Sequence, residues 1–299
     1  MSTESPRSLK QLYASHPRKW REFCYVYPVI SRRSKGLSIG VNLNPDKVCN
    51  WDCVYCQVDR TPGSISAVTT VDIDQLRGEL DWMLGWAASG AIWDDPQFAG
   101  VPGELRRIND IAFSGDGEPT TYPRFDEACQ LAADLIAAHA LPAVKVIVLT
   151  NMTMLHRPAV QRGLAILDQH PSEIWAKLDA GTQAYYEQVD RSAVKLDRIL
   201  ANILEAGRAR PIVIQSLFMQ LHGEPIPPEE FDAYLDRLSE LVDQGCRIKL
   251  VQLYTIARQT TESYASPLTN EQLESLAARF RERLPQVPVE TYAGVEDAA

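Results

Sequence analysis

Residues 36–60 read GLSIGVNLNPDKVCNWDCVYCQVDR, a stretch that joins an apolar run to a dense group of cysteines. The run at 36–44 alternates small residues with Leu, Ile and Val, which predicts a β-strand. The cysteines that follow, Cys49, Cys53 and Cys56, have the spacing C-x3-C-x2-C. A loop with this spacing can turn three thiolates toward one point. Thiolates are soft ligands that bind iron–sulfur clusters, zinc or Cu(I).

A fourth ligand is not close in sequence, since the next cysteine is Cys129 and the next histidine is His139. Three ligands leave one position of a metal centre open, and open positions are where catalytic metals bind water, substrate or cofactor. The other cysteines, Cys24, Cys129 and Cys246, have no ligand spacing among themselves. Ordinary burial accounts for Cys129 and Cys246, so we expect no second cluster.

Downstream of this motif, strand-like and helix-like patterns alternate along the chain. Asp72–Ser89 has apolar residues at helical spacing, and 144–150 (VKVIVLT) is the clearest buried strand. The predicted strands are 36–44, 108–114, 144–150, 173–178, 212–219 and 247–254. The predicted helices are 72–89, 124–140, 158–169, 193–206, 229–244 and 270–284.

Six strand–helix units in regular order predict an α/β fold with a parallel sheet and right-handed crossovers. A full eight-fold barrel needs about 250 residues, so we predict a partial (βα)6 TIM-type barrel. The expected divisions are a basic N-terminal extension at 1–35, the barrel at 36–260 and a C-terminal helical segment at 261–299. In such folds the chemistry collects on loops at the carboxyl ends of strands.

Composition sets limits on class and location. The 299 residues are 45% hydrophobic and 23% charged, which is globular rather than disordered composition. The most apolar long stretch, 131–149, contains Asp134, His139, Pro142 and Lys145, so we expect no membrane span. The N-terminus lacks an apolar signal core, which predicts a cytoplasmic location.

Charge is distributed unevenly along the chain. Residues 1–36 hold eight basic and two acidic groups, a net +6, which leaves −15 on the remainder because the total is −9. One interpretation is a solvated arm that packs on an acidic body. The other is a basic patch for a phosphate-bearing partner such as RNA.

The segment CNWDCVYC resembles the cluster motif of the radical S-adenosylmethionine (SAM) enzymes, in which an aromatic residue commonly precedes the last cysteine, as Tyr55 does here. The resemblance implies a [4Fe–4S] cluster on Cys49, Cys53 and Cys56, with SAM chelating the fourth iron. It also implies reductive cleavage of SAM to a 5′-deoxyadenosyl radical that abstracts hydrogen from a substrate. A one-electron donor such as a flavodoxin or ferredoxin would reduce the cluster.

Two further loops resemble family loops that contact SAM. After the second predicted strand comes SGDGEPT, in which Gly115, Asp116, Gly117 and Glu118 resemble the Gly-Gly-Glu loop that binds the methionine amino group. Asp116 between the glycines departs from that pattern, and the alternative for Glu118 is a plain turn with a solvated carboxylate. Asn151 follows the third strand and either contacts cofactor or substrate or caps the next turn.

Polar residues at three later strands complete the candidate site. Lys177 and Asp179 project to the same side of the chain, either as catalytic groups or as a structural ion pair. Gln215 is a candidate for cofactor binding, and a one-residue change of register would substitute Ser216. Arg258 lies just past the last strand, where it is either a carboxylate clamp or a surface residue.

The blocks 27–60, SGDGEPTTYP and VQLYTIAR resemble an uncharacterised bacterial branch that is distantly related to the wyosine-type enzymes, which modify transfer RNA. Only Cys24 precedes the motif, whereas the wyosine enzymes carry further N-terminal cysteines for a second cluster. We therefore expect a small-molecule substrate. RNA modification and a non-catalytic zinc- or cluster-binding module are the alternatives.

Overall fold

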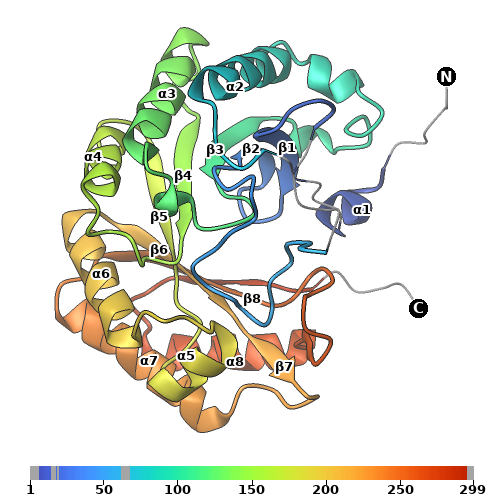
Figure 1. The fold of residues 1–299 in the computed structure, drawn as a ribbon. Coiled ribbons are helices and arrows are strands. Elements are labelled where there is room, and N and C mark those ends of the chain that lie inside the picture. The colour runs from blue at the N-terminus through green and yellow to red at the C-terminus, as the bar shows by residue number, and fades with distance from the viewer. Residues whose placement is uncertain (1–6, 15–17, 19, 62–67, 295–299) are drawn as a thin grey trace. The chain divides into compact units, whose positions relative to one another are not determined.

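The computed structural model describes residues 7–14, 18, 20–61 and 68–294 (Figure 1). It is a mixed α/β fold whose main sheet has eight strands, which confirms the predicted class. Packing divides the chain into two compact units: unit 1 comprises 1–48, 62–148 and 156–172, and unit 2 comprises 49–61, 149–155 and 173–299. The predicted partial (βα)6 barrel and the divisions at residues 35 and 260 stay predictions.

Unit 1 carries the first part of the sheet. Its strands run in the order β1 (Val26–Ser31), β2 (Gly36–Val41), β3 (Ile108–Phe113) and β4 (Lys145–Thr150), the last of which extends into unit 2. β1 is antiparallel to β2, whereas β2, β3 and β4 are parallel. β2 confirms the strand predicted over 36–44, and every one of its residues is buried.

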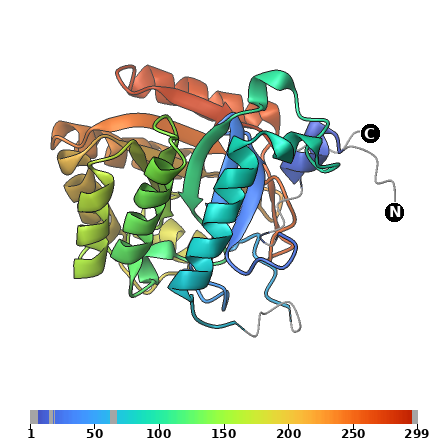
Figure 2. The same ribbon diagram turned by 90° about the horizontal axis from the view of Figure 1, so that it is seen from above.

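The described part of unit 1 has four α-helices, of which all but the first were predicted from the sequence. They are α1 (Leu9–Ala14), α2 (Ile73–Ala88), α3 (Phe125–Ala138) and α4 (Pro158–Leu167), with short 3₁₀ turns at Ala91–Asp94, Gly103–Leu105 and Pro119–Thr121. The Asp72 side chain accepts hydrogen bonds from backbone N–H groups at the start of α2, so Asp72 is the N-cap of this helix. Figure 2 shows α2, α3 and α4 side by side, in agreement with the contacts of α3 with both neighbours.

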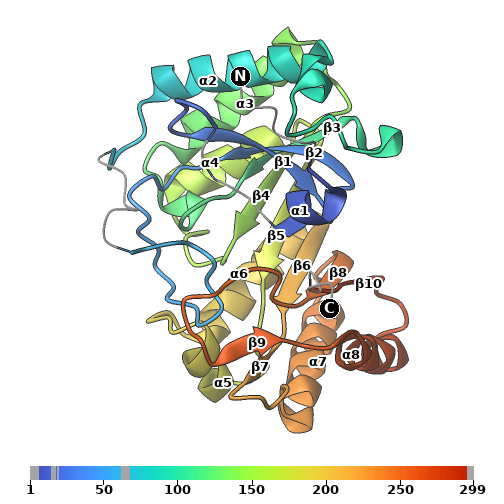
Figure 3. The same cartoon turned by 90° about the vertical axis from the view of Figure 1, so that its right-hand side faces the viewer.

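Unit 2 carries a parallel set of strands and a small hairpin. Its main strands are β5 (Ser172–Lys177), β6 (Ile212–Leu217), β8 (Ile248–Tyr254) and β10 (Val289–Tyr292), and β6 pairs in parallel with both β5 and β8. β7 (Met219–Leu221) and β9 (Ala265–Pro267) form an antiparallel pair, visible in Figure 3. The prediction of one strand over 212–219 is therefore wrong, since β6 ends at Leu217 and Met219 pairs elsewhere.

The helices of unit 2 are α5 (Gln183–Val189), α6 (Leu196–Ala209), α7 (Pro228–Asp243) and α8 (Asn270–Arg283). α7 begins at a proline, and α8 begins with a capping box in which Thr269 and Gln272 bond reciprocally. Each of the six predicted strand regions overlaps an observed strand, and each predicted helix region overlaps an observed helix. Among the described residues, no helix is both long and apolar enough to cross a membrane.

Candidate functional site

The cysteine motif lies on a loop of unit 2 that begins eight residues after β2 ends. Cys49, Cys53 and Cys56 are all partly exposed, whereas Cys129 and Cys246 are buried. The backbone N–H of Cys56 donates to the carbonyl of Cys53 at 3.0 Å, so the last two cysteines of the motif are joined by a tight turn. The motif cysteines therefore differ from the two buried ones in both setting and solvent access.

One tether holds the start of this loop. The Asn50 side chain donates to Thr153 Oγ1 at 2.6 Å and accepts from Asn151 Nδ2 at 2.7 Å. Asn151 in turn accepts from the backbone and hydroxyl of Thr153, so it caps the turn after β4, which was the structural alternative for this residue. Contact of Asn151 with a cofactor stays a prediction.

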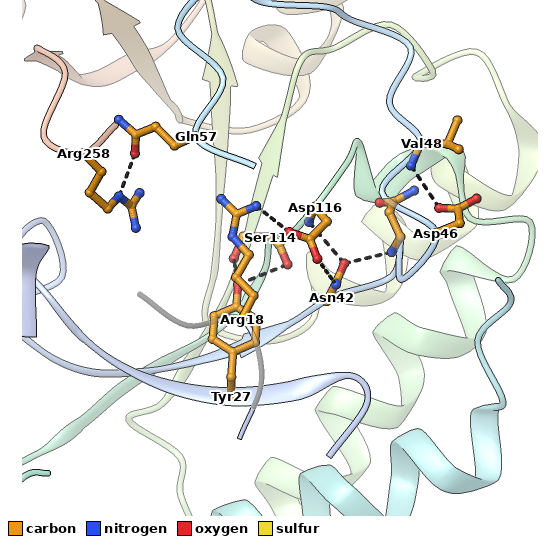
Figure 4. A network of polar contacts seen from close by, with 10 residues as sticks. Arg18, Tyr27, Asn42, Asp46, Val48, Gln57, Ser114, Asp116 and Arg258 are labelled. Atoms are coloured by element: carbon orange, nitrogen blue, oxygen red, sulfur yellow. Dashed lines mark hydrogen bonds and ion pairs between the residues drawn. The ribbon is translucent and has the colours of Figure 1, made fainter. Parts of the chain in front are cut away.

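A second tether holds the end of the loop. Arg258 Nε donates to Gln57 Oε1 at 2.7 Å (Figure 4), and the backbone N–H of Thr261 donates to the Cys56 carbonyl at 2.9 Å. Arg258 thus contacts the residue next to a motif cysteine. Its predicted role as a carboxylate clamp is not tested by these contacts.

No group of three or more His, Cys, Asp or Glu side chains is arranged to hold a metal ion in the described part of the chain, which includes all six cysteines. The donor set of Cys49, Cys53 and Cys56 nevertheless fits an iron–sulfur cluster in its chemistry, since three thiols share one partly exposed loop. Burial, reinforced by the nearby Asp190 carboxyl, raises the pKa of the Cys53 thiol well above its usual value. Binding of a metal must therefore displace a proton from Cys53.

Tyr55 of the cysteine loop belongs to a buried polar group that we call the Tyr55 cluster. Its members are Tyr55, Lys177, Asp179, Asp190 and Tyr254. The Tyr55 hydroxyl lies 2.5 Å from Asp179 Oδ2 and 2.9 Å from Asp190 Oδ1. Lys177 Nζ lies 3.0 Å from Asp179 Oδ1 and donates to the Tyr254 hydroxyl at 2.6 Å. The same ammonium lies 5.0 and 4.8 Å from the ring centres of Tyr55 and Tyr254, within cation–π range.

The electrostatics of the Tyr55 cluster shift the pKa values of Asp190 and Lys177. Burial, with the neighbouring Asp179 carboxylate, raises the pKa of Asp190 well above its usual value. Burial alone would lower the pKa of Lys177, but the Asp179 carboxylate and the Tyr254 hydroxyl outweigh it, and the pKa is raised. Lys177 and Asp179 therefore form the ion pair that was the structural alternative, and their catalytic roles stay predictions.

Gln215 lies on β6 with only 1% of its surface exposed. Its Nε2 donates to Gln252 Oε1 at 2.7 Å, and the two residues occupy partner positions in the parallel ladder. Ser216, the alternative under a change of register, instead donates to the Leu178 carbonyl at 2.6 Å. Both side chains are thus engaged within unit 2.

In unit 1, the loop after β3 packs tightly against the segment that follows β2. A Cβ on Gly115 would lie 2.4 Å from Asn42 Oδ1, and one on Gly117 would lie 2.4 Å from the Val48 carbonyl oxygen. Only glycine fits such close approach. Figure 4 shows the Asp116 carboxylate between its two partners, Arg18 Nη1 at 2.9 Å and Asn42 Nδ2 at 2.8 Å.

Glu118 is buried, with 3% of its surface exposed, which excludes the solvated carboxylate that was its structural alternative. Its Oε1 accepts from the backbone and the hydroxyl of Thr120, so it caps the 3₁₀ turn at Pro119–Thr121. Contact of Glu118 with a cofactor ammonium stays a prediction.

Two basic residues of the N-terminal region, Arg18 and Arg21, have partners within unit 1. Beyond the Arg18–Asp116 pair, Arg21 lies 3.2 Å from Asp95 and 5.0 Å from the ring centre of Trp20. Lys19 lies outside the described residues. Arg18 and Arg21 thus make contacts within unit 1, as expected for an arm that packs on an acidic surface.

Sequence reasoning missed Asp190 and the tether residues Asn50 and Thr153. Asp190 ends a short helix, α5, that no periodic pattern predicted. The aromatic position before the last cysteine singled out Tyr55, but not its partners, which lie 124 and 135 residues away in sequence.

Comparison with known sequences gives remote relatives, and no protein-family model matches the chain. The GTPase Obg of Brachyspira hyodysenteriae is 23% identical over 256 residues, which cover 85% of this chain and 33% of that protein. A UPF0026 protein of Helicobacter pylori is 27% identical over 179 residues, which cover 59% of this chain and 49% of that protein. The chain thus spans between a third and half of these relatives. It contains no Gly-Lys pair and hence no P-loop, so the first name does not argue for GTP hydrolysis.

Comparison with solved structures gives matches that cover most of this chain. A radical SAM methyltransferase from Sphaerobacter thermophilus superposes with a TM-score of 0.58 at 14% identity, covering 90% of this chain and 70% of that one. Streptococcus suis SuiB bound to S-adenosylmethionine superposes with a TM-score of 0.56 at 12% identity, covering 87% of this chain and 52% of that one. The chain therefore has the fold of the radical SAM enzymes, which the resemblance of its cysteine motif predicted.

Proposed function

We propose that this chain is a radical SAM enzyme, which cleaves S-adenosylmethionine reductively in order to abstract hydrogen from a small-molecule substrate. Cys49, Cys53 and Cys56 would hold a [4Fe–4S] cluster. The chemistry that such a cluster supplies when bound is the transfer of one electron to the sulfonium of SAM. An external one-electron donor of the flavodoxin or ferredoxin type would then reduce the cluster again.

The observation that carries this proposal is the setting of the three cysteines. They share one partly exposed loop. Hydrogen bonds hold Asn50 beside Cys49, Val54 beside Cys53, and Cys56 itself. The fold around that loop is found in solved radical SAM enzymes. Buried structural cysteines, such as Cys129, need neither solvent access nor tethers.

The residues that we propose as contacts of SAM are Gly115, Asp116, Gly117, Glu118, Asn151, Gln215 and Arg258. The side chains of Asn151, Gln215 and Arg258 each donate a hydrogen bond to a protein group. A cofactor that contacts these three side chains must share or replace those hydrogen bonds, so we expect its binding to change the side-chain conformations at these positions.

Within the Tyr55 cluster, we propose an electrostatic role for Lys177. Because its pKa is raised, Lys177 keeps its proton at neutral pH and is a poor general acid. Asp179 accepts from Tyr55, from Lys177 and from the backbone N–H of Leu217 at 2.7 Å. Asp179 therefore holds the Lys177 ammonium at a fixed place, where the cation can attract an anionic substrate group.

A small molecule is the substrate class that charge favours. The chain has a net charge of −9, and Arg18 and Arg21 already pair with Asp116 and Asp95. A polyanion such as RNA gains little from a surface of this kind.

The test is anaerobic reconstitution with iron and sulfide, followed by incubation with a reductant and SAM. We expect about four irons per chain and formation of 5′-deoxyadenosine by mass spectrometry. One zinc per chain with no cleavage of SAM would instead indicate a non-catalytic module.

Two alanine variants form a matched pair for this test. Cys53→Ala should abolish cluster binding, whereas Cys129→Ala, a buried cysteine outside the motif, should leave the iron content unchanged. Equal loss of iron in both variants would refute the ligand assignment.

A further inference from the structure

The segment that ends helix α5 is bonded to the cysteine loop on both sides of Cys53. The backbone N–H of Asp52 donates to the Asp190 carbonyl at 3.2 Å, and that of Val54 donates to the Val189 carbonyl at 2.9 Å. Two main-chain hydrogen bonds to adjacent carbonyls fix the backbone that carries Cys53. Residues 189–190 thus act as a support for the middle cysteine.

The side chain of Asp190 reaches the same loop through a second route. Its Oδ1 lies 2.9 Å from the hydroxyl of Tyr55, two residues after Cys53 and one before Cys56. Asp190 has no exposed surface, and Tyr55 is 7% exposed. A buried tyrosine that is held at its hydroxyl has little rotational freedom, so the backbone between Cys53 and Cys56 is fixed as well.

The contacts of the Tyr55 hydroxyl show why Asp190 matters in addition to Asp179. A phenol has one proton, and it cannot donate to both carboxyl groups at once. The Tyr55 hydroxyl thus donates to one carboxyl group and contacts the other through its oxygen. An asparagine at 190 keeps a polar group beside that hydroxyl, whereas an alanine does not.

We infer that Asp190 is a positioning residue, which holds Tyr55 and so fixes the orientation of Cys53 and Cys56 for cluster binding. The inference rests on the proposed function for its purpose, but the restraint on the loop exists in the metal-free chain. The Asp190 side chain positions the two cysteines through Tyr55, whose hydroxyl it contacts.

The test compares Asp190→Ala, Asp190→Asn and a matched surface control, Asp243→Ala, whose side chain is exposed at the end of α7. In the metal-free protein, alkylation of Cys53 by iodoacetamide is followed by peptide mass spectrometry, with Cys24 as an internal reference. We expect Asp190→Ala to speed alkylation of Cys53 about tenfold, since a lost hydrogen bond of about 1.4 kcal/mol corresponds to that factor. Because the Asp190 carboxyl also raises the pKa of the Cys53 thiol, each rate is divided by the thiolate fraction of Cys53 in that variant. On that scale Asp190→Asn and Asp243→Ala should match the wild type.

The second readout is the electron paramagnetic resonance spectrum of the reduced, reconstituted protein. A changed orientation of two ligands should alter the g values in Asp190→Ala and not in Asp190→Asn. A variant that lowers only the melting temperature, with unchanged alkylation and spectrum, would show a purely structural role and overturn the inference. Asparagine behaving like alanine would overturn it too.

If Asp190→Ala does not fold, Tyr55→Phe takes its place, because it removes the same hydroxyl contact. Faster alkylation of Cys53 in that variant supports the inference, and an unchanged rate overturns it. Failure of the wild type to take up iron would defeat the proposed function alone, since the alkylation rates of the metal-free variants still decide the role of Asp190.

Discussion

Replacing Lys177 by methionine tests how the Tyr55 cluster is stabilised. Methionine keeps an unbranched apolar side chain and removes the ammonium, which is the one cation among the five members. The change leaves Asp179, whose surface is 1% exposed, without its ion pair at 3.0 Å. It also removes the hydrogen bond to the Tyr254 hydroxyl at 2.6 Å.

The expected cost follows from burial. Removing one partner of a buried ion pair typically costs about 3–5 kcal/mol, because the remaining charge is left without compensation. Since 15% of the Lys177 side chain remains exposed, we expect the lower part of that range, about 3 kcal/mol in the free energy of unfolding. Adding Asp179→Asn removes the stranded charge, so the double variant should recover at least about 1 kcal/mol of that loss.

Urea unfolding at pH 7, followed by circular dichroism, measures these differences. Lys195→Met is the matched control, because Lys195 pairs with Glu187 at 2.8 Å while 71% and 50% of the two side chains are exposed. Such a surface pair is worth at most about 1 kcal/mol. The reasoning fails if Lys177→Met costs no more than Lys195→Met, or if Asp179→Asn recovers nothing.

Four further substitutions have defined outcomes. Glu79→Ala should lower the free energy of unfolding by about 3 kcal/mol or more, because three backbone N–H groups at and just before the start of β1 lose their acceptor; a loss under about 1 kcal/mol in a denaturant titration contradicts this. Gly117→Ala should destabilise by about 1–3 kcal/mol through its approach to the Val48 carbonyl. Gly78→Ala, exposed in α2 with open space around it, should stabilise by about 0.5–1 kcal/mol. A melting temperature that rises in Gly117→Ala, or falls in Gly78→Ala, contradicts the prediction for that variant. As pH rises from about 4, the free energy of unfolding of Asp190→Asn should increase relative to that of the wild type, by up to about 1.4 kcal/mol per pH unit. The reason is that the pKa of Asp190 is raised in the folded state, so the wild type loses stability between the unfolded-state and folded-state pKa values of this residue. A constant difference between the two proteins over this range refutes the prediction.

Periodic patterns predicted the elements whose burial is set by their own sequence. The apolar run at 144–150 became β4, and the helical spacing after Asp72 became α2 with Asp72 as its cap. The elements that were missed depend on partners elsewhere in the chain. β1 lies in a stretch that its charges marked as an arm, and it is a strand because Glu79 of α2 holds its start and β2 pairs with it.

The candidate site divides in the same way. Lys177 and Asp179 are two residues apart, so alternation along a strand was enough to place them together. Asp190 joins them through the end of a seven-residue helix, and no local pattern carries that information. Glu118 and Asn151 were found by resemblance, but their hydrogen bonds to neighbouring backbone follow from turn geometry that only the fold fixes.

The tethers of the cysteine loop also set an order of events during protein synthesis. The three cysteines leave the ribosome early, by residue 56, whereas their tethers come from residues 151–153, 189–190 and 258–261. A nascent chain of half length thus exposes all three thiols with none of their supports. Under the proposed function, iron delivered at that moment would meet a chain without these tethers, so cluster assembly would follow completion of the polypeptide.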